Sequence, residues 1–219
     1  MSTVVIYLGG DGPVEAPKIK GKVSAVIAAD SGLELADSHG IMVNLIIGDF
    51  DSADPEIVEK YVSAGSIKEE FPTEKEVTDF ELALLAAKDY EAENLIIIGG
   101  AGQRLDHLLG NISVLAGEQT SRWIVDAHFG DVNISICRPG QPRNITSKFG
   151  ECISLIPVGG HVEGVSTSGL KWKLDEDSFN TNFARGISNE STDENISVDV
   201  KSGSLAILHG PLESVENEQ

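Results

Sequence analysis

The chain is short of cysteine, aromatic residues and positive charge, and each shortage excludes a class of protein. Its 219 residues include two cysteines, Cys137 and Cys152, too few for a disulfide scaffold or a cysteine metal cluster. The chain has 16 basic and 35 acidic residues, which gives a formal net charge of −19. Such a surface repels nucleic acid and anionic membranes, so we expect neither as a partner. A small cationic ligand would be attracted.

Long hydrophobic runs are also missing. No stretch approaches the roughly 18 apolar residues of a transmembrane helix. The first residues have the pattern of a strand and lack the basic region of a signal peptide. Together with the scarcity of cysteine, this predicts a cytoplasmic protein. The 41% of hydrophobic residues are nevertheless enough for a buried core.

Short, almost wholly apolar segments alternate with helical patterns in the first part of the chain. Residues 4–8, 23–28, 45–47 and 95–98 have the composition of parallel strands buried on both faces. Each is followed by Gly or Asp, directly or after one further residue. The segments predict an N-terminal three-layer α/β domain with a mostly parallel sheet, over residues 1–128.

Three helices are expected in this domain from their starting signals. Asp54 caps a helix that begins at Pro55, and Thr78 with Glu81 forms a capping box. The third helix is expected over residues 106–119. Its apolar face is predicted to consist of Leu108, Leu109, Ile112 and Leu115.

After about residue 131 the pattern changes to short strand-like pieces separated by turns. The expected strands are residues 132–137, 144–148, 152–157, 161–166, 170–174, 196–200 and 205–208. Closely spaced strands without intervening helices are typical of an antiparallel sandwich or barrel. We therefore predict a C-terminal all-β sandwich domain over residues 129–219.

Six acidic residues follow strands or begin helices, where open α/β sheets bind their ligands. They are Asp11, Asp30, Asp49, Asp51, Asp79 and Asp106. Any one of them could be a turn former or a helix cap, as we take Asp54 to be. Several together repel one another unless a cation lies among them, and magnesium prefers such oxygen ligands. The spacing of Asp49 and Asp51 would place both side chains on one side of an extended strand end. This pair predicts a divalent-metal site for phosphate chemistry.

A glycine-rich turn follows the strand at residues 95–98. Residues 99–107 read Gly-Gly-Ala-Gly-Gln-Arg-Leu-Asp-His, and backbone amides in such a turn can approach a phosphate. The run matches neither the dinucleotide-binding fingerprint nor the P-loop. Arg104 could grip a phosphate through two hydrogen bonds, and Lys75 is a second cation near the acids. Both could equally be ordinary surface residues; His107 is given a minor binding role.

Two runs stand out in the second part of the chain, residues 166–172 and 185–190. The first ends in Trp172, one of two tryptophans in the sequence. A tryptophan in a small β-domain is usually a core residue. Its ring could also be a stacking plate for a flat cationic ligand, which the face of an indole attracts.

Taken together, these runs resemble the thiamin pyrophosphokinase family, also called thiamin diphosphokinases. The matching runs are 29–32 (Ala-Asp-Ser-Gly), 48–52 (Gly-Asp-Phe-Asp-Ser), 72–79 (Pro-Thr-x-Lys-x-x-Thr-Asp), 99–107, 168–172 (Ser-Gly-Leu-Lys-Trp) and 188–190 (Ser-Asn-Glu). Six runs in the family's order are a specific match, which covers residues 28 to 190. The chain departs from the family at Glu76, where an aspartate is frequent.

The resemblance implies a homodimeric enzyme that uses Mg²⁺ to transfer the pyrophosphoryl group of ATP to the hydroxyl of thiamin, giving thiamin diphosphate and AMP. The implied catalytic residues are Asp49, Asp51, Asp79 and Asp106, of which the first three would also hold the metal. The implied ATP-binding residues are Asp30, Ser31, Lys75, Thr78, Arg104 and His107. Thiamin would lie at the subunit interface, against Ser168, Leu170, Trp172, Ser188 and Asn189.

Two other functions remain open from the sequence. A phosphohydrolase with an aspartyl nucleophile also carries an Asp-x-Asp pair, but usually after its first strand, whereas two strands precede Asp49 here. A non-catalytic sensor could bind thiamin or a nucleotide in the same pocket. Retention of Arg104 and of every metal-type aspartate argues against the sensor.

Overall fold

The computed structural model describes residues 1–74, 76–102, 104–182 and 184–210. The chain forms two compact units. The first comprises Met1–Val114 with Glu118–Gly130, and the second comprises Leu115–Gly117 with the chain from Asp131 onward. Among the described residues, none of the helices has the length and apolar character needed to cross a membrane.

The first unit is built on six parallel strands in the order β4-β3-β2-β1-β5-β6. Their bounds are β1 (Ser2–Leu8), β2 (Lys22–Ala29), β3 (Leu45–Gly48), β4 (Ile67–Glu70), β5 (Asn94–Ile98) and β6 (Ile124–Phe129). The four apolar segments of the sequence are β1, β2, β3 and β5, which confirms the predicted parallel sheet.

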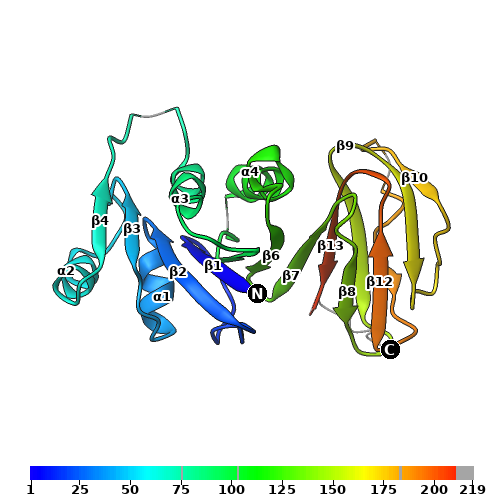
Figure 1. The fold of residues 1–219 in the computed structure, drawn as a ribbon, viewed down its shortest axis with the longest axis horizontal. Coiled ribbons are helices and arrows are strands. Elements are labelled where there is room, and N and C mark those ends of the chain that lie inside the picture. Colours follow the sequence, from blue (N-terminus) through cyan, green and yellow to red (C-terminus); the bar gives the residue numbers. More distant parts are fainter. Residues whose placement is uncertain (75, 103, 183, 211–219) are drawn as a thin grey trace, which may run out of the picture. The chain divides into compact units, whose positions relative to one another are not determined.

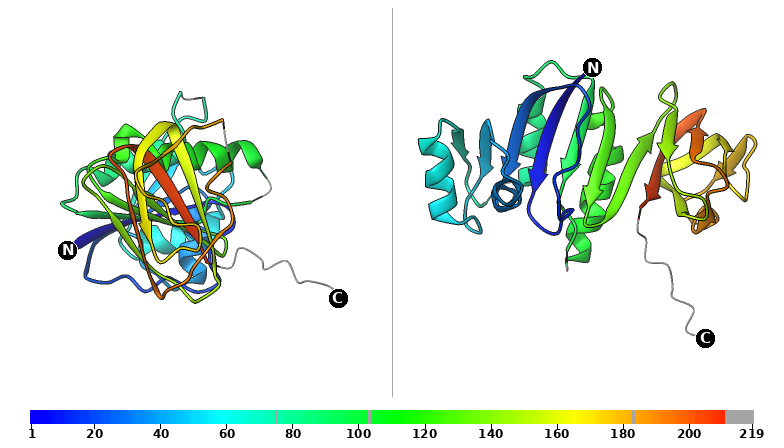
Figure 2. Two further views of the ribbon diagram at one scale, coloured as in Figure 1. Left: turned by 90° about the vertical axis from the view of Figure 1, so that its right-hand side faces the viewer. Right: turned by 90° about the horizontal axis from the view of Figure 1, so that it is seen from below.

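Helices cover both faces of this sheet (Figures 1 and 2). α1 (Gly32–Ser38) and α2 (Pro55–Ser63) lie on one face, and α3 (Asp79–Ala87) and α4 (Leu105–Ala116) lie on the other; a short 3-10 helix, η1 (Glu118–Thr120), follows α4. Both predicted caps are confirmed: Asp54 Oδ1 accepts from the Glu56 amide at 2.8 Å. Thr78 Oγ1 accepts from the Glu81 amide at 3.2 Å, while Glu81 Oε2 accepts from the Thr78 amide at 2.9 Å.

α4 is more exposed than its sequence pattern predicted. Leu115 is fully buried, but Leu109 is 57% exposed and Leu105 is 65% exposed. The expected core face of this helix is therefore only partly a core face within the chain. An exposed apolar surface of this kind often marks a site where another protein chain or a ligand binds.

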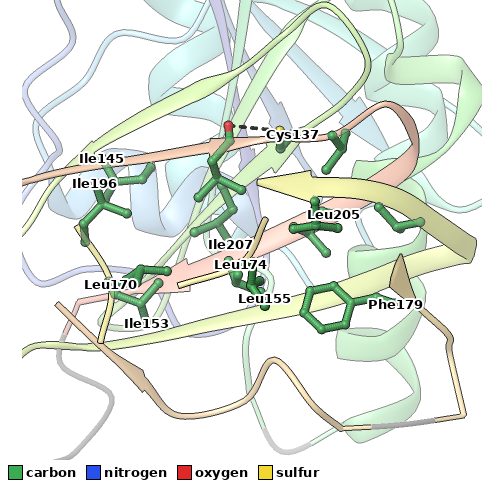
Figure 3. Close-up of a cluster of buried hydrophobic side chains, with 14 residues drawn as sticks. Cys137, Ile145, Ile153, Leu155, Leu170, Leu174, Phe179, Ile196, Leu205 and Ile207 are labelled. Carbon is green, nitrogen blue, oxygen red and sulfur yellow. Dashed lines mark hydrogen bonds between the residues drawn. The ribbon is translucent and has the colours of Figure 1, made fainter. Parts of the chain in front are cut away.

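The second unit is all-β, with antiparallel pairing throughout its described strands. It contains β7 (Val132–Cys137), β8 (Arg143–Thr146), β9 (Cys152–Ser168), β10 (Asp177–Phe179), β11 (Asn189–Glu190), β12 (Asn195–Asp199) and β13 (Ser202–His209). The order is β7-β13-β9-β12-β8, and β10 and β11 also pair with β9. The buried side chains between these strands form one core, drawn in Figure 3.

Two strand predictions in this unit were wrong. Residues 152–157 and 161–166 are a single strand, β9. It pairs with β11 at its start, with β13 between Ser154 and Glu163, and with β10 and β12 in its second half. Gly159 adopts a φ of +80° within it, so the backbone bends without ending the strand. Residues 170–174 form no strand beyond an isolated bridge between Leu170 and Ser191.

Candidate active site

The candidate site lies where the strand order of the first unit reverses, between β1 and β5. Open α/β sheets bind ligands in the crevice at such a switch point. The loops that leave the two strands are joined there: the Asp11 amide donates to the Ala101 carbonyl at 2.8 Å, and the Gly100 amide donates to the Gly9 carbonyl at 3.1 Å. Asp11 thus ties the loops together through its backbone.

A cavity of about 720 Å³ opens beside these loops. Its volume is within the range of roughly 300–1,000 Å³ typical of small-molecule sites. It is lined by the glycine-rich turns, by polar side chains and by apolar side chains such as Leu8, Phe80 and Val114. The predicted site residues among the lining are Asp30, Ser31, Thr78, Asp79, Arg104, Asp106 and His107. Lys75 lies outside the described residues.

Three carboxylates gather at the ends of β2 and β3. One carboxylate oxygen from each of Asp30, Asp49 and Asp51 lies within 4.8 Å of the other two. The residue pattern predicted a metal at Asp49 and Asp51 and placed Asp30 among the neighbouring acids, whereas the resemblance assigned Asp30 to ATP. Gly48, with a φ of +152°, makes the approach possible, because a Cβ there would lie 3.2 Å from the Asp30 Cβ.

The turn between Asp49 and Asp51 differs from the expected extended strand end. Phe50 has a φ of +59°, a left-handed conformation that is uncommon for a bulky residue and often found at functional sites. The Asp51 amide donates to Asp49 Oδ1 at 3.2 Å. The Phe50 ring packs against the core beneath α1 and α2, with the Lys68 ammonium 4.4 Å from the ring centroid. A left-handed turn therefore brings the two carboxylates together.

The charges of this carboxylate group oppose one another. The neighbouring Asp49 charge, followed by desolvation and the Asp30 charge, raises the pKa of Asp51 above its usual value. Asp30 Oδ2 accepts from Ser52 Oγ, while Asp30 Oδ1 is buried without a hydrogen-bond partner in the described part of the chain. A cation among these oxygens would relieve the repulsion and satisfy Asp30 Oδ1. The donors are hard oxygens, which fit Mg²⁺.

Asp79 and Asp106 line the cavity, as Asp30 does, whereas Asp49 and Asp51 are not among its lining residues. Asp79 is the first residue of α3, and its charge contributes to the raised pKa of Asp51, although it is outside the group of three. Asp106 is bound by Arg104, whose Nε and Nη2 donate to its two oxygens at 3.2 and 2.6 Å. The Arg104 hydrogen bond lowers the pKa of Asp106 to about 2. The six aspartates therefore do not converge on one point.

Two residues that shape the site were missed from the sequence. Glu34 of α1 accepts the Asp54 amide at 2.5 Å and so holds the loop that follows Asp51. Asn111 of α4 donates to the Gly100 carbonyl at 3.0 Å and anchors the glycine-rich turn. Both lie inside helices and outside every motif, so only the packing of those helices reveals them.

In the second unit, Trp172 is 56% exposed, and its interpretation as a core residue is wrong. The Lys171 ammonium lies 5.0 Å from its ring centroid and pairs with Glu190 at 2.6 Å. Ser168 is exposed and shares a 2.6 Å hydrogen bond with Ser197, and Ser188 is exposed as well.

The other two residues expected to bind thiamin are buried. Leu170 packs into the core of the second unit, so its side chain does not face outward. Asn189 is 6% exposed, and its amide is bonded to the Trp172 backbone. Direct ligand contacts by these two side chains do not fit this arrangement.

Comparisons with known proteins agree with both units. Residues 16–125 match the model of the thiamin pyrophosphokinase catalytic domain, and residues 141–205 match that of the vitamin B1 binding domain of the same family. The thiamine pyrophosphokinase of Bacillus subtilis is 27% identical over 164 residues, which are 75% of this chain and 77% of that protein. Thiamine pyrophosphokinase 3 of Oryza sativa subsp. japonica is 30% identical over 170 residues, but the match spans 63% of its length.

Solved structures share the fold over nearly the whole chain. The crystal structure of the Bacillus subtilis enzyme superposes with a TM-score of 0.77 at 23% identity, covering 95% of this chain and 98% of that one. A thiamin pyrophosphokinase family protein from Enterococcus faecalis gives 0.76 at 21% identity, with 96% and 99% covered. At these identities the likeness concerns the fold. Because the catalytic-domain model alone matches half of the sequence, and the second model matches most of the β unit, the chain belongs to the thiamin pyrophosphokinase family.

Proposed function

We propose that the protein is a thiamin diphosphokinase, which transfers the pyrophosphoryl group of ATP to thiamin and releases AMP. The observation that carries the proposal is the group of Asp30, Asp49 and Asp51 beside a cavity at the strand switch point. This group lies within the segment that matches the family's catalytic-domain model. The alternatives that the sequence left open share the carboxylates but have no comparable support from the relatives.

The proposed reaction is an in-line displacement at the β-phosphorus of ATP. The hydroxyl oxygen of thiamin forms the new bond to this phosphorus, the bond to the α–β bridging oxygen breaks, and AMP leaves with that oxygen. Such transfers need positioning and charge neutralisation more than covalent catalysis. The hydroxyl proton passes to a carboxylate. Asp79 and Asp49 are the candidates, and the position of Asp79 on the cavity wall, outside the group of three, favours Asp79.

Residues of the chain would divide the remaining tasks. Asp30, Asp49 and Asp51, with Asp79 nearby, would hold Mg²⁺, which when bound neutralises the charge of the phosphates. Arg104 would bind a phosphate oxygen, which requires its guanidinium to be shared with Asp106 or released from it. The glycine-rich turn would let backbone amides approach the nucleotide.

We also propose a homodimer in which thiamin binds at the subunit interface. Leu105 and Leu109 of α4 expose apolar surface in the first unit, and Trp172 and Ile187 do so in the second. Association of two chains would cover these residues, and the Trp172 ring would offer its face to the thiazolium cation of thiamin. Both cysteines are free thiols, which supports the reducing environment of the cytoplasm.

The proposal is tested by incubating the full chain with thiamin, ATP and Mg²⁺ and separating the products by chromatography. We expect thiamin diphosphate and AMP in equal amounts, and neither when Mg²⁺ is chelated. Thiamin monophosphate is the matched control, because its hydroxyl is already esterified. Tight thiamin binding without product would indicate the sensor instead, and phosphate release from a phosphomonoester without thiamin would indicate a phosphohydrolase.

A further inference from the structure

The side-chain amide of Asn189 is committed to the backbone of Trp172. Asn189 Nδ2 donates to the Trp172 carbonyl at 2.9 Å, and Asn189 Oδ1 accepts from the Trp172 amide at 3.2 Å. The same oxygen accepts from the Glu190 amide at 2.8 Å. Asn189 is 6% exposed, whereas Trp172 is 56% exposed. A buried amide thus grips both backbone polar groups of an exposed tryptophan.

This arrangement replaces a missing piece of sheet. Leu170 forms an isolated bridge with Ser191, and the Lys171 amide donates to the Glu190 carbonyl at 2.9 Å. At Trp172 the pairing with a neighbouring backbone stops, and the Asn189 side chain takes over both hydrogen bonds that a strand would make. An asparagine amide has the same donor and acceptor pair as a peptide group, which is why it can do so.

The backbone just before Asn189 is shaped to aim this side chain inward. Ser188 has a φ of +60°, in the left-handed region. Its amide donates to Ser154 Oγ at 3.0 Å, which fixes the turn on β9. Held in this way, Asn189 has its polar atoms directed at Trp172 rather than outward.

We infer that Asn189 is a positioning residue, which holds Trp172 in the orientation that receives the cationic ring of thiamin. The inference rests on the proposed function, because that function supplies thiamin as the ligand of Trp172. Because the backbone of Trp172 is already fixed, the tryptophan loses less conformational entropy when the ligand stacks on its ring. Asn189 acts on the ligand through Trp172 alone.

The kinetic test uses Asn189→Ala, Asn189→Asp and, as the matched control, Asn195→Ala, which removes an exposed asparagine of the same unit. We expect Asn189→Ala to raise the KM for thiamin about tenfold and to leave the KM for ATP within about twofold. Asn189→Asp keeps the acceptor for the Trp172 amide but loses the donor. Its KM for thiamin should therefore lie between those of the natural protein and of Asn189→Ala. The control, Asn195→Ala, should have the same KM values as the natural protein.

A double-mutant cycle with Trp172→Ala separates positioning from direct contact. If Asn189 acts through the tryptophan, Asn189→Ala should add no further increase in the KM for thiamin once Trp172 is gone. An equal increase in both backgrounds would overturn the inference, because it would mean that Asn189 contacts thiamin itself or supports the fold generally. Thermal melts identify variants that fail to fold, and Asn189→Asp then replaces Asn189→Ala.

Fluorescence gives a readout that does not depend on catalysis. Trp123 is fully buried, so iodide quenches mainly the exposed Trp172. In the absence of substrates, Asn189→Ala should increase iodide quenching and lower the anisotropy of the quenchable emission, while Asn195→Ala should change neither. Unchanged fluorescence in a folded Asn189→Ala protein would overturn the inference. Failure to form thiamin diphosphate would instead count against the proposed function.

Discussion

Asp51 is held in a place where its own charge is unfavourable, and this has a consequence for stability. Its pKa is raised, chiefly by Asp49, so the folded chain binds the Asp51 proton more tightly than the unfolded chain. The resulting stabilisation is present below the unfolded pKa of about 3.9 and is lost as pH rises through the folded pKa. At neutral pH, ionised Asp51 therefore opposes folding unless a cation is bound.

We predict that Asp51→Asn raises the melting temperature in metal-free buffer at pH 7. The gain should disappear near pH 3, where Asp51 is protonated in the natural protein. Added Mg²⁺ should raise the melting temperature of the natural protein more than that of the variant, since the variant lacks one carboxylate charge. Scanning calorimetry with and without chelator measures all three effects, and an identical Mg²⁺ response in both proteins would contradict the metal role.

The same substitution should remove catalysis. We expect Asp51→Asn to lower kcat by at least about 100-fold, because charge stabilisation of the transferring phosphoryl group is usually a large part of catalysis. Asp54→Asn is the matched control: asparagine caps helices as well as aspartate does, so α2 should persist and turnover should be unchanged. Normal turnover by Asp51→Asn, with circular dichroism showing an intact fold, would refute its assignment.

Arg104 shows how the shape of a cation matters at this site. Its guanidinium binds both oxygens of Asp106, a fork that lysine cannot reproduce. We predict that Arg104→Lys raises the KM for ATP about tenfold and changes the KM for thiamin little. Steady-state kinetics with each substrate varied in turn measures the difference. Equal rises in both KM values would indicate a general disturbance of the site.

At the scale of the element, the sequence predicted the features that depend on residues close together in the chain. The caps at Asp54 and Thr78 and the apolar strands depend on neighbouring residues, and the structure confirms them. β4 was missed because all four of its residues are exposed. β6 was overlooked although its alternating burial, with Val125, Ala127 and Phe129 inside, is typical of a strand. The sequence placed Asp30 among six acids at strand ends and helix starts. Which of the six meet depends on β2 lying beside β3, and no local pattern contains that information.

The packing of α1 on β1 provides a prediction at this scale. A Cβ on Gly32 would lie 2.3 Å from the Tyr7 carbonyl oxygen and 2.8 Å from the Leu8 amide nitrogen. Because both are backbone atoms of a central strand, Gly32→Ala must push the helix away from the sheet. We expect a loss of at least about 2 kcal/mol in the free energy of unfolding, within the range for overpacked cores.

Gly110 is the matched control for this substitution. It lies within α4, and a Cβ there would meet nothing within 4 Å. Alanine is more favourable than glycine inside a helix by about 1 kcal/mol, so Gly110→Ala should be neutral or stabilising. Urea unfolding of the two variants measures the contrast. Equal stabilities would mean that α1 can shift on the sheet without cost.

At the scale of the whole molecule, the proposed shared site can be tested by mixing inactive chains. Asp79→Asn disables the first unit of one chain, and Trp172→Ala disables the second unit of the other. If each site draws on both chains, a hybrid dimer rebuilds one intact site, and random exchange of equal amounts should restore about a quarter of the natural activity. Exchange proven by mass spectrometry without any recovery would place each site within one chain.

The exposed strand β4 also limits how copies of the chain can meet. It ends the described sheet of the first unit, with Lys68, Glu69 and Glu70 along it. The open backbone of an edge strand can template growth by strand addition, and charged side chains oppose such growth. We therefore expect concentrated protein to remain dispersed rather than form cross-β fibres at this edge. A discrete oligomer would have to form through contacts between side chains and not through backbone hydrogen bonds at β4.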